Sequence, residues 1–322
     1  MFGRLRTIKN IKKIEDDLYR VDYYANYKLD KLLMQGVKNV NDLVSFVSKE
    51  LFFGYPIKVE ENLSACTAFV ATTPDDKQIV GRNFDYPKTG AMLVYTRPKN
   101  AYASYSMICL AHLDMNEEDN TMPNRLIGKI MTLTSPFACV DGLNEKGLSV
   151  SVLELETEPT AQDTGKIPII TTVAIRMLLD KCATTNEAVK VLEKYDMHSS
   201  AGCPYHLLIT DAKGITVVVA WPEQKMVVTN NTFATNFQLA PGKDEGVGFG
   251  HNRYEIVQNT LDKTKGILSE ADAMELLSHV KITKNAERNF ATQWSIVYNI
   301  NDFTAIVCKD MKYDSVHSII SK

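Results

Sequence analysis

The sequence predicts an α+β fold in which two β-sheets pack face to face and helices cover their outer faces. Short runs of β-branched and apolar residues recur along the chain, helical patterns occur in groups, and no internal repeat is present. Strands are expected near residues 66–73, 78–84, 91–97, 103–110, 148–155, 205–210, 214–221, 225–229, 294–300 and 303–309. Helices are expected near residues 168–182, 186–195, 252–262 and 270–280.

Turn and capping residues mark where several of these elements begin and end. Residues 73–77 (TPDDK) separate the first two strands, so these strands are expected to form a hairpin. Thr184 with Glu187 has the spacing of a capping box, and Ser269 is expected to cap the last helix. The polar, turn-rich residues 113–128 indicate a surface loop.

Residues 1–65, called the N-terminal segment below, are expected to be helical. A first amphipathic helix is predicted from the near-helical spacing of Leu5, Ile8, Ile11, Ile14, Leu18 and Val21. A second is predicted over residues 40–53, with Asn41 as its cap. The favoured partner for their apolar faces is the rest of the chain, with the segment acting as a cover over the active site. The alternative is a weak contact between a membrane surface and the basic first helix, which carries Phe2 and Leu5.

The composition is that of an ordinary globular chain with room for one large core, at 322 residues and 45% hydrophobic residues. A net charge of −3 gives no electrostatic reason to expect nucleic acid as a partner. The basic start lacks the apolar core of a secretory signal, and the six cysteines show no Cys-x-x-Cys spacing. Reduced thiols in a cytoplasm are therefore expected. The scattered histidines form no ligand pair, so neither a metal nor a cofactor is expected.

Cys66 is the candidate nucleophile. It begins the first strand of the predicted hairpin, and Arg82 and Asp85 lie at the end of the second strand. An arginine favours the thiolate, which is the nucleophilic form of cysteine. If Cys66 became a chain terminus, Asp85 could orient the new α-amino group, whose pKa suits a general base. The competing interpretation is a buried structural cysteine beside an ordinary ion pair.

Several segments together resemble the choloylglycine hydrolase family. Besides Cys66 and the Arg82 and Asp85 of GRNFD, the matching segments are 140–148 (VDGLNEKGL), 205–214 (YHLLITDAKG), 235–236 (TN) and 252–254 (NRY). The family includes bile salt hydrolases, penicillin V acylases and the related acid ceramidase and N-acylethanolamine acid amidase. The resemblance implies a four-layer αββα sandwich of the N-terminal nucleophile hydrolase type.

The resemblance also implies roles for single residues. Cys66 would be the nucleophile, Arg82 and Asp85 its close supports, Asn236 an oxyanion-hole donor, and Arg253 a further cation of the active site. A side-chain amide at position 236 suits this role, because acyl transfer builds negative charge on a carbonyl oxygen. The competing interpretation of Asn236 is a turn residue.

Two departures from bile salt hydrolases are visible. Glu154 stands near the position where those enzymes carry an asparagine, which is more similar to acid ceramidase and N-acylethanolamine acid amidase. In addition, the whole N-terminal segment precedes Cys66. The resemblance therefore implies autocatalytic cleavage between Ala65 and Cys66, with residues 1–65 as a helical propeptide, cleaved or retained, and residues 66–322 as the catalytic domain.

The sequence thus predicts an autoprocessed cysteine amidase that hydrolyses a linear N-acyl amide through a thioester. The substrate would be a small molecule of the fatty N-acyl amide, N-acyl amino acid or bile-amide class. The resemblance also implies a homo-oligomer. Two alternatives remain open at this point: an acyltransferase of the same fold, and a catalytically silent protein that binds acyl lipids.

Overall fold

Two β-sheets pack face to face at the centre of the structure, a computed structural model that describes residues 2–51, 64–284 and 289–319. The nine-stranded sheet contains, in spatial order, β1 (Ile11–Glu15), β2 (Leu18–Tyr23), β5 (Ala91–Thr96), β6 (Ser104–Cys109), β7 (Cys139–Asn144), β8 (Ser149–Glu154), β11 (Tyr205–Thr210), β12 (Thr216–Ala220) and β13 (Val227–Thr229). The six-stranded sheet contains β14 (Phe233–Ala234), β3 (Ala65–Thr72), β4 (Gln78–Tyr86), β17 (Ala291–Asn299), β18 (Thr304–Lys309) and β19 (Val316–Ile319).

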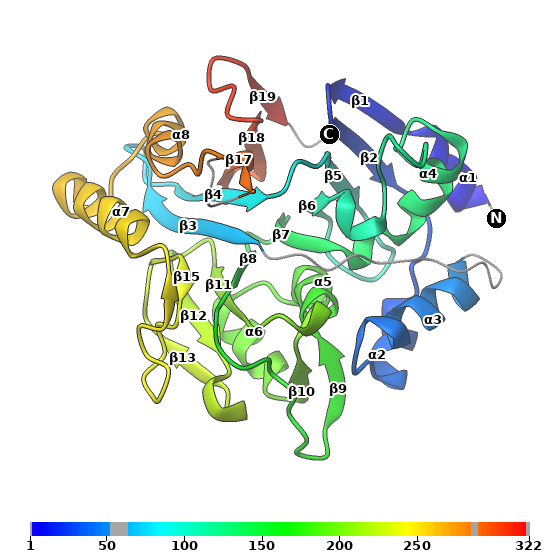
Figure 1. The fold of residues 1–322 in the computed structure, drawn as a ribbon, viewed down its shortest axis with the longest axis horizontal. Coiled ribbons are helices and arrows are strands. Elements are labelled where there is room, and N and C mark those ends of the chain that lie inside the picture. The colour runs from blue at the N-terminus through cyan, green and yellow to red at the C-terminus, as the bar shows by residue number, and fades with distance from the viewer. Residues whose placement is uncertain (1, 52–63, 285–288, 320–322) are drawn as a thin grey trace.

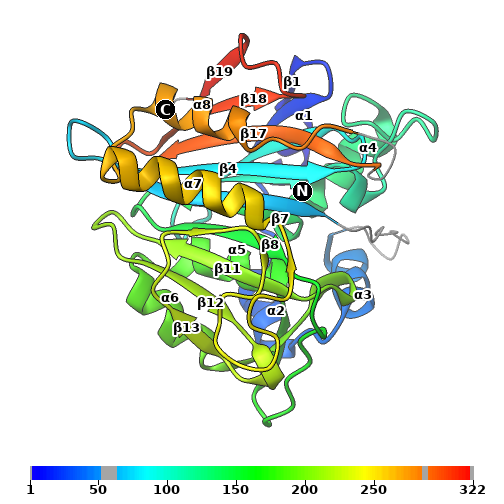
Figure 2. The ribbon, with the colours of Figure 1, turned by 60° about the vertical axis from the view of Figure 1, so that its left-hand side comes forward.

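Helices cover the outer faces of both sheets, as Figures 1 and 2 show. On the nine-stranded sheet lie α5 (Thr171–Lys181) and α6 (Thr185–Leu192), and on the six-stranded sheet lie α7 (His251–Thr264) and α8 (Glu270–His279). The four layers confirm the αββα prediction. Capping also follows the sequence, because the Thr184 side chain accepts a hydrogen bond from Glu187 N and Ser269 forms a capping box with Asp272.

Smaller elements complete the fold. Two short strand pairs are present, the parallel β9 (Ile167–Ile170) and β10 (Tyr195–His198) and the antiparallel β15 (Asn236–Phe237) and β16 (Gly248–Phe249). The remaining helices of the described residues are α1 (Phe2–Lys9), α2 (Leu29–Gln35), α3 (Val40–Leu51), α4 (Leu126–Met131) and the 3-10 turns η1 (Ala111–Leu113), η2 (Thr132–Phe137), η3 (Ser200–Gly202) and η4 (Pro222–Gln224). Within the described residues, no helix is long and apolar enough to cross a membrane.

The prediction of a helix through residues 5–21 is wrong beyond Lys9. The chain there forms an antiparallel hairpin of β1 and β2, and Asp17 closes its turn with a left-handed φ of 60°. That conformation interrupts a helix. In β2, Tyr19, Val21 and Tyr23 are buried while Arg20 and Asp22 between them are half-buried, and this alternation with aromatic and β-branched residues favours a strand. The second predicted helix is confirmed as α3 over Val40–Leu51, and residues 52–53 of that prediction lie outside the described residues. Asn39 Oδ1, rather than Asn41, accepts the hydrogen bond from Asp42 N.

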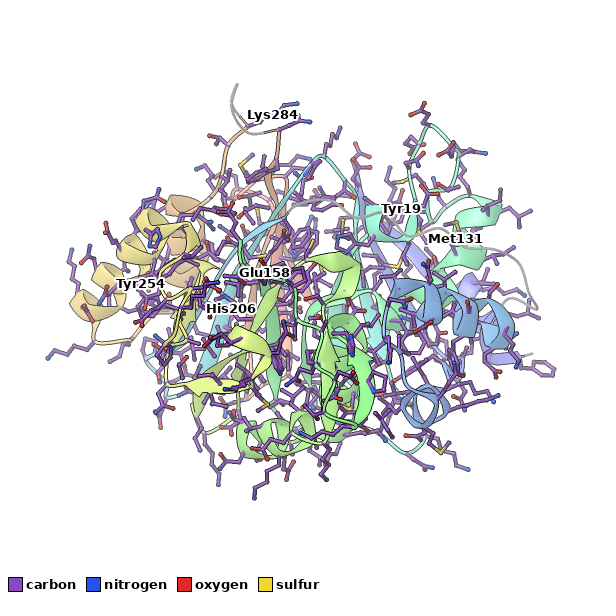
Figure 3. All side chains as sticks on the ribbon, turned by 60° about the horizontal axis from the view of Figure 1, so that its bottom comes forward. Tyr19, Met131, Glu158, His206, Tyr254 and Lys284 are labelled. Atoms are coloured by element: carbon purple, nitrogen blue, oxygen red, sulfur yellow. The ribbon has the colours of Figure 1, made fainter. Side chains whose placement is uncertain are left out.

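The N-terminal segment is built into the core rather than laid over it. Strand β2 pairs in parallel with β5 inside the nine-stranded sheet. The Tyr23 hydroxyl donates to Leu133 O at 2.8 Å, and the Tyr27 hydroxyl donates to Asp180 Oδ2 at 2.5 Å, both in buried surroundings. In Figure 3, Tyr19 of this segment and Met131 are labelled towards the right of the view, and Tyr254 of α7 towards the left.

Candidate active site

The hairpin of β3 and β4 positions Cys66 and its two predicted supports. Its register pairs Cys66 with Phe84 and Ala65 with Asp85. Successive residues of a strand point to opposite faces, so Arg82 shares the face of Cys66, whereas Asp85 points to the other face. The two supports therefore approach Cys66 from different sides, Arg82 from the thiol side and Asp85 from the side of the backbone.

Arg82 contacts the thiol directly. Its Nη2 donates to Cys66 Sγ at 3.3 Å, and both side chains are buried. Burial raises the pKa of the Cys66 thiol to about 11, and the Arg82 charge opposes that increase. In the uncut chain the thiol is thus mainly protonated at neutral pH, with a cation in place to stabilise the thiolate when it forms.

Asp85 lies in a second buried charge group with Arg253. Thr292 Oγ1 donates to Asp85 Oδ1 at 2.5 Å, and Arg253 Nη1 lies 3.6 Å from Asp85 Oδ2. Burial raises the pKa of Asp85 to about 6, with Arg253 and the Thr292 hydrogen bond acting in the opposite direction. Asp85 Oδ2 makes no hydrogen bond within the described residues, so one buried acceptor remains at the β4 residue that pairs with Ala65.

Asn236 and Arg253 hold the backbone of Cys66. Asn236 Oδ1 accepts from Cys66 N at 2.8 Å and from Arg253 Nη2 at 2.9 Å, while Asn236 Nδ2 donates to Glu154 O at 2.8 Å. Arg253 Nη1 donates to Cys66 O at 2.6 Å. Gly250 precedes α7 with a φ of 90°, and a Cβ atom there would stand 2.6 Å from Arg253 Nη2, so glycine both permits the turn and leaves room for the guanidinium.

Glu154, at the end of β8, contacts the residue two before Cys66. Its Oε2 accepts hydrogen bonds from Ser64 N at 2.7 Å and from Ser64 Oγ at 2.6 Å. Burial raises the pKa of Glu154, and the bonds from Ser64 oppose this increase. All six predicted site residues therefore lie together around the Ala65–Cys66 peptide.

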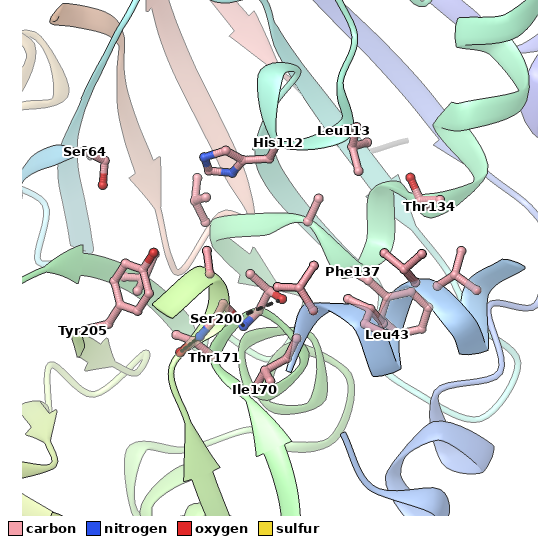
Figure 4. A pocket seen from close by; sticks show the side chains of 18 of the residues that line it. Leu43, Ser64, His112, Leu113, Thr134, Phe137, Ile170, Thr171, Ser200 and Tyr205 are labelled. Carbon is pink, nitrogen blue, oxygen red and sulfur yellow. Dashed lines mark hydrogen bonds between the residues drawn. The ribbon is translucent and has the colours of Figure 1, made fainter. Parts of the chain in front are cut away.

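An apolar cavity begins at Cys66 and extends between the sheets towards the N-terminal segment. It contains about 960 Å³ of space not filled by protein atoms, part of it open to solvent. In Figure 4, Ser64, His112 and Tyr205 lie towards one end, and Leu43 of α3 and Phe137 towards the other. Helix α3 supplies Val40, Leu43, Val44 and Val47 to the wall. The N-terminal segment thus forms part of the cavity next to the thiol.

Sequence reasoning missed several residues that contact this site. Asp141 Oδ2 lies 2.7 Å from Arg82 Nε. Thr292 donates a hydrogen bond to Asp85, and Thr67 accepts one from Arg253. The signal for Asp141 was present, because it lies in one of the segments that carry the family resemblance. His206 is buried, with Nε2 2.9 Å from Thr235 O. No disulfide forms among the six cysteines, and within the described residues no group of His, Cys, Asp or Glu is arranged to hold a metal ion.

Two of the solved structures compared with this chain support the fold. Two variants of conjugated bile acid hydrolase from Clostridium perfringens are similar, with TM-scores of 0.58 and 0.59 and identities of 17% and 16%, each comparison covering 79% of this chain and 92% of the other. Penicillin V acylase from Agrobacterium tumefaciens gives a TM-score of 0.49 at 17% identity, covering 76% of this chain and 83% of the other. No curated protein matches the sequence.

The family follows from a direct match to the sequence. The family described as linear amide C-N hydrolases, choloylglycine hydrolase family, matches residues 66–241, which is more than half of the chain. This match begins at Cys66 and contains four of the other predicted site residues, Arg82, Asp85, Glu154 and Asn236. The chain belongs to the choloylglycine hydrolase family of linear amide C–N hydrolases, which act on carbon–nitrogen bonds other than peptide bonds.

Proposed function

We propose that this protein cuts itself between Ala65 and Cys66 and then acts as a cysteine amidase on linear N-acyl amides with an apolar acyl group. The observation that carries the proposal is the position of the Cys66 thiol, which meets Arg82 on one side and opens into the apolar cavity on the other. A buried structural cysteine would need neither a cation nor a cavity.

Self-cleavage would begin with attack of Cys66 Sγ on the carbonyl carbon of Ala65. The S–C bond forms, the Ala65–Cys66 C–N bond breaks, and the thiol proton passes to the nitrogen, which becomes the α-amino group of Cys66. Water then hydrolyses the thioester and frees the thiol. Glu154 supports this step because it holds Ser64, next to the bond to be cut, through two hydrogen bonds.

Amide hydrolysis would use the groups released by this cleavage. The new α-amino group would lie between Asn236 Oδ1 and Asp85 Oδ2, an oxygen that makes no hydrogen bond within the described residues, and these two acceptors would fix it for proton transfer. Cys66 Sγ attacks the substrate carbonyl, the amine leaves with a proton from the α-amino group, and water releases the acid from the thioester. Asn236 Nδ2 carries two N–H groups and Glu154 O takes one, so the second is available to stabilise the oxyanion.

The cavity favours a hydrocarbon chain as the acyl group. Its wall is dominated by Val, Leu, Ile, Phe and Ala side chains, which favour contact with a hydrocarbon chain over contact with water. Fatty N-acyl amides are therefore the first substrates to test. N-acyl amino acids and bile amides are the comparison classes, because they change the amine or the shape of the acyl group.

We also propose that the N-terminal segment stays with the catalytic domain after cleavage. Strand β2 lies between β1 and β5, and Tyr27 is bonded to the buried Asp180. If the segment dissociated, the buried apolar side chains of β2 would become exposed on the released fragment, and the cavity would lose the wall formed by α3. Residues 1–65 would then be a cleaved but retained subunit rather than a released propeptide.

The test is the denatured intact mass of the purified protein beside its Cys66→Ala variant. Two fragments meeting at Ala65 and Cys66 in the wild type, and one chain in the variant, are expected. Native size-exclusion chromatography should keep the two fragments together. A wild-type chain that remains whole at every pH and shows no hydrolysis of any N-acyl amide would overturn the proposal and favour a silent acyl-binding protein. Product that forms only when an amine is added would favour an acyltransferase.

A further inference from the structure

We infer that Asp141, held by Tyr298, is a positioning residue that aims Arg82 at the Cys66 thiol. The inference rests on the proposed function, because it assigns a part in the chemistry of Cys66. It concerns two residues that sequence reasoning did not assign to the site. Arg82, Asp141 and Tyr298 are called the thiol triad below.

The Arg82 guanidinium spans the space between the two sheets. From β4 of the six-stranded sheet, Nη1 donates to Val152 O on β8 at 2.6 Å, and Nε lies 2.7 Å from Asp141 Oδ2 on β7. The remaining nitrogen, Nη2, meets Cys66 Sγ at 3.3 Å. A guanidinium is a planar, rigid fork. Fixing two of its nitrogens on the nine-stranded sheet therefore determines where the third one points.

Asp141 is itself held at both oxygens. Oδ2 faces Arg82, and Oδ1 accepts a hydrogen bond from the Tyr298 hydroxyl at 2.6 Å. Tyr298 lies on β17 of the six-stranded sheet, so the triad crosses between the sheets twice. All three side chains are fully buried. The carboxylate cannot rotate without breaking one of these bonds, so the position of the guanidinium depends on both partners.

Neither Asp141 nor Tyr298 is in reach of a substrate. Among the described residues, the cavity lining includes Val140 and Val152 but neither member of this pair. Arg253 has a separate anion in Asp85, so Asp141 is the carboxylate that neutralises Arg82. Any effect of Asp141 or Tyr298 on the chemistry must therefore pass through Arg82.

A second buried cluster of the same residue types provides the matched control. Arg176 Nη2 lies 2.7 Å from Asp180 Oδ1, and the Tyr27 hydroxyl donates to Asp180 Oδ2 at 2.5 Å. Arg176 Nη2 also donates to Ser104 Oγ at 2.6 Å. Among the described contacts this guanidinium makes no hydrogen bond to a thiol, although its charge acts to lower the pKa of the nearby Cys139 thiol, which burial raises. Arg176, Asp180 and Tyr27 are called the docking triad below. Equivalent substitutions remove the same bond in both triads, but only one triad contacts Cys66.

The experiment measures the alkylation rate of Cys66 by iodoacetamide from pH 6 to 10, followed by peptide mass spectrometry at that residue. Charged groups around the thiol that shape this profile are Arg82 and Asp85 of β4, Glu154 of β8 and Arg253 of α7. Tyr298→Phe should slow alkylation at pH 8 by about threefold to tenfold, because Asp141 loses its hydrogen bond from the Tyr298 hydroxyl. Asp141→Asn should slow it by at least as much, because Arg82 Nε loses the carboxylate that lies 2.7 Å away. Tyr27→Phe and Asp180→Asn should leave the rate within about twofold of wild type.

The direction of the effect separates positioning from charge. Loss of the Asp141 negative charge would, by itself, favour the thiolate and speed alkylation. Slower alkylation in folded Asp141→Asn therefore supports positioning, and faster or unchanged alkylation overturns it. Equal slowing by Tyr27→Phe would also overturn it, because general loosening of the core would then explain the result. If Asp141→Asn does not fold, Tyr298→Phe decides the question, since it leaves every charge in place.

This readout does not depend on the proposed amidase activity. A chain that neither cleaves itself nor hydrolyses amides still has a Cys66 thiol whose alkylation can be timed. Loss of the Tyr298 effect with intact self-cleavage would refute the positioning role alone. A clear Tyr298 effect without any amide hydrolysis would leave the positioning of Arg82 supported and reject the proposed reaction.

Discussion

The thiol triad and the docking triad use the same three residue types at nearly the same distances but in different structural settings. Arg176 and Asp180 are one turn apart on α5, so their pairing is local, and Tyr27 joins them from the N-terminal segment. Arg82 and Asp141 come from opposite sheets, and their pairing is possible only after the sheets have packed. The partner of Nη2 therefore separates the two clusters: in the thiol triad it is Cys66 Sγ, and in the docking triad it is Ser104 Oγ together with Asp180. On our proposals, the first cluster aims a cation and the second holds a segment in place.

The largest expected effect is that of Arg82→Met. It should slow Cys66 alkylation and self-cleavage by about a hundredfold or more, because the buried thiolate loses its cation. It should also destabilise the fold by roughly 3–5 kcal/mol, because Asp141 is left buried without its partner. Quenched alkylation assays on wild type and Arg82→Met measure the change in rate, and urea unfolding of the same two proteins measures the change in stability.

Arg176→Met is the control for this prediction. It should cause a similar loss of stability with normal alkylation of the remaining folded protein. If both substitutions slow alkylation equally, the division of roles between the two triads is wrong.

Asp85→Asn extends the comparison to a third buried carboxylate, one with a longer ion pair. A pKa raised from 3.8 to about 6 means that the folded state holds the Asp85 proton more tightly than the unfolded state does. Ionisation of Asp85 therefore lowers the free energy of unfolding by roughly 3 kcal/mol as the pH rises from about 4 to above 6. Asn236 and the rest of the site are unchanged in this variant.

Because asparagine cannot ionise, the stability of Asp85→Asn relative to wild type should increase by this amount between pH 4 and pH 7.5. Urea unfolding at the two pH values checks the prediction. A difference that stays constant with pH would show that the pKa of Asp85 is not raised.

Tyr27→Phe should cost about 1–3 kcal/mol of stability, because Asp180 Oδ2 loses its hydrogen-bond donor in a buried position. Its effect should be larger on the cleaved protein, in which the N-terminal segment is held by noncovalent contacts alone. Thermal unfolding before and after cleavage measures this difference. Dissociation of wild-type fragments at the same rate as those of the variant would count against a docking role.

The smallest expected effect concerns the cavity wall supplied by α3. Leu43→Ala should raise kcat/KM for longer acyl chains over shorter ones, by a factor on the order of ten, because it lengthens the cavity at the end away from Cys66. Leu126→Ala, on exposed α4, is the control and should leave the preference unchanged. An unchanged preference in Leu43→Ala would indicate that the acyl group does not reach the N-terminal segment.

The sequence predicted the parts of the site that lie close together in the chain or in the family pattern. The hairpin turn at residues 73–77 places Arg82 and Asp85 beside Cys66, as observed. The pairing of Asp141 with Tyr298 was out of reach, because the two residues lie 157 positions apart in sequence and meet only across packed sheets. A contact of this kind leaves no local pattern of turns, caps or periodicity.

The error in the N-terminal segment has a physical cause as well. Apolar residues at positions 11, 14, 18 and 21 satisfy a helical spacing, yet Asp17 turns the chain and the buried side chains of β2 alternate. Tertiary contacts with β5 decide in favour of the strand, because the segment completes a sheet that is already present. The spacing of residues within the segment contains no information about the unpaired edge of β5, with which β2 pairs.

The insertion of β2 into the sheet has a consequence for the life of the molecule. In the uncut chain, β2 and β5 are joined by a covalent link, so folding is a unimolecular process whose midpoint is independent of protein concentration. After a cut at Ala65–Cys66 the same strands belong to two chains, and refolding requires them to meet again. Heated and diluted, the mature protein would then fail to recover under conditions in which Cys66→Ala recovers fully. The mature protein could then be formed efficiently only by folding before the chain is cut.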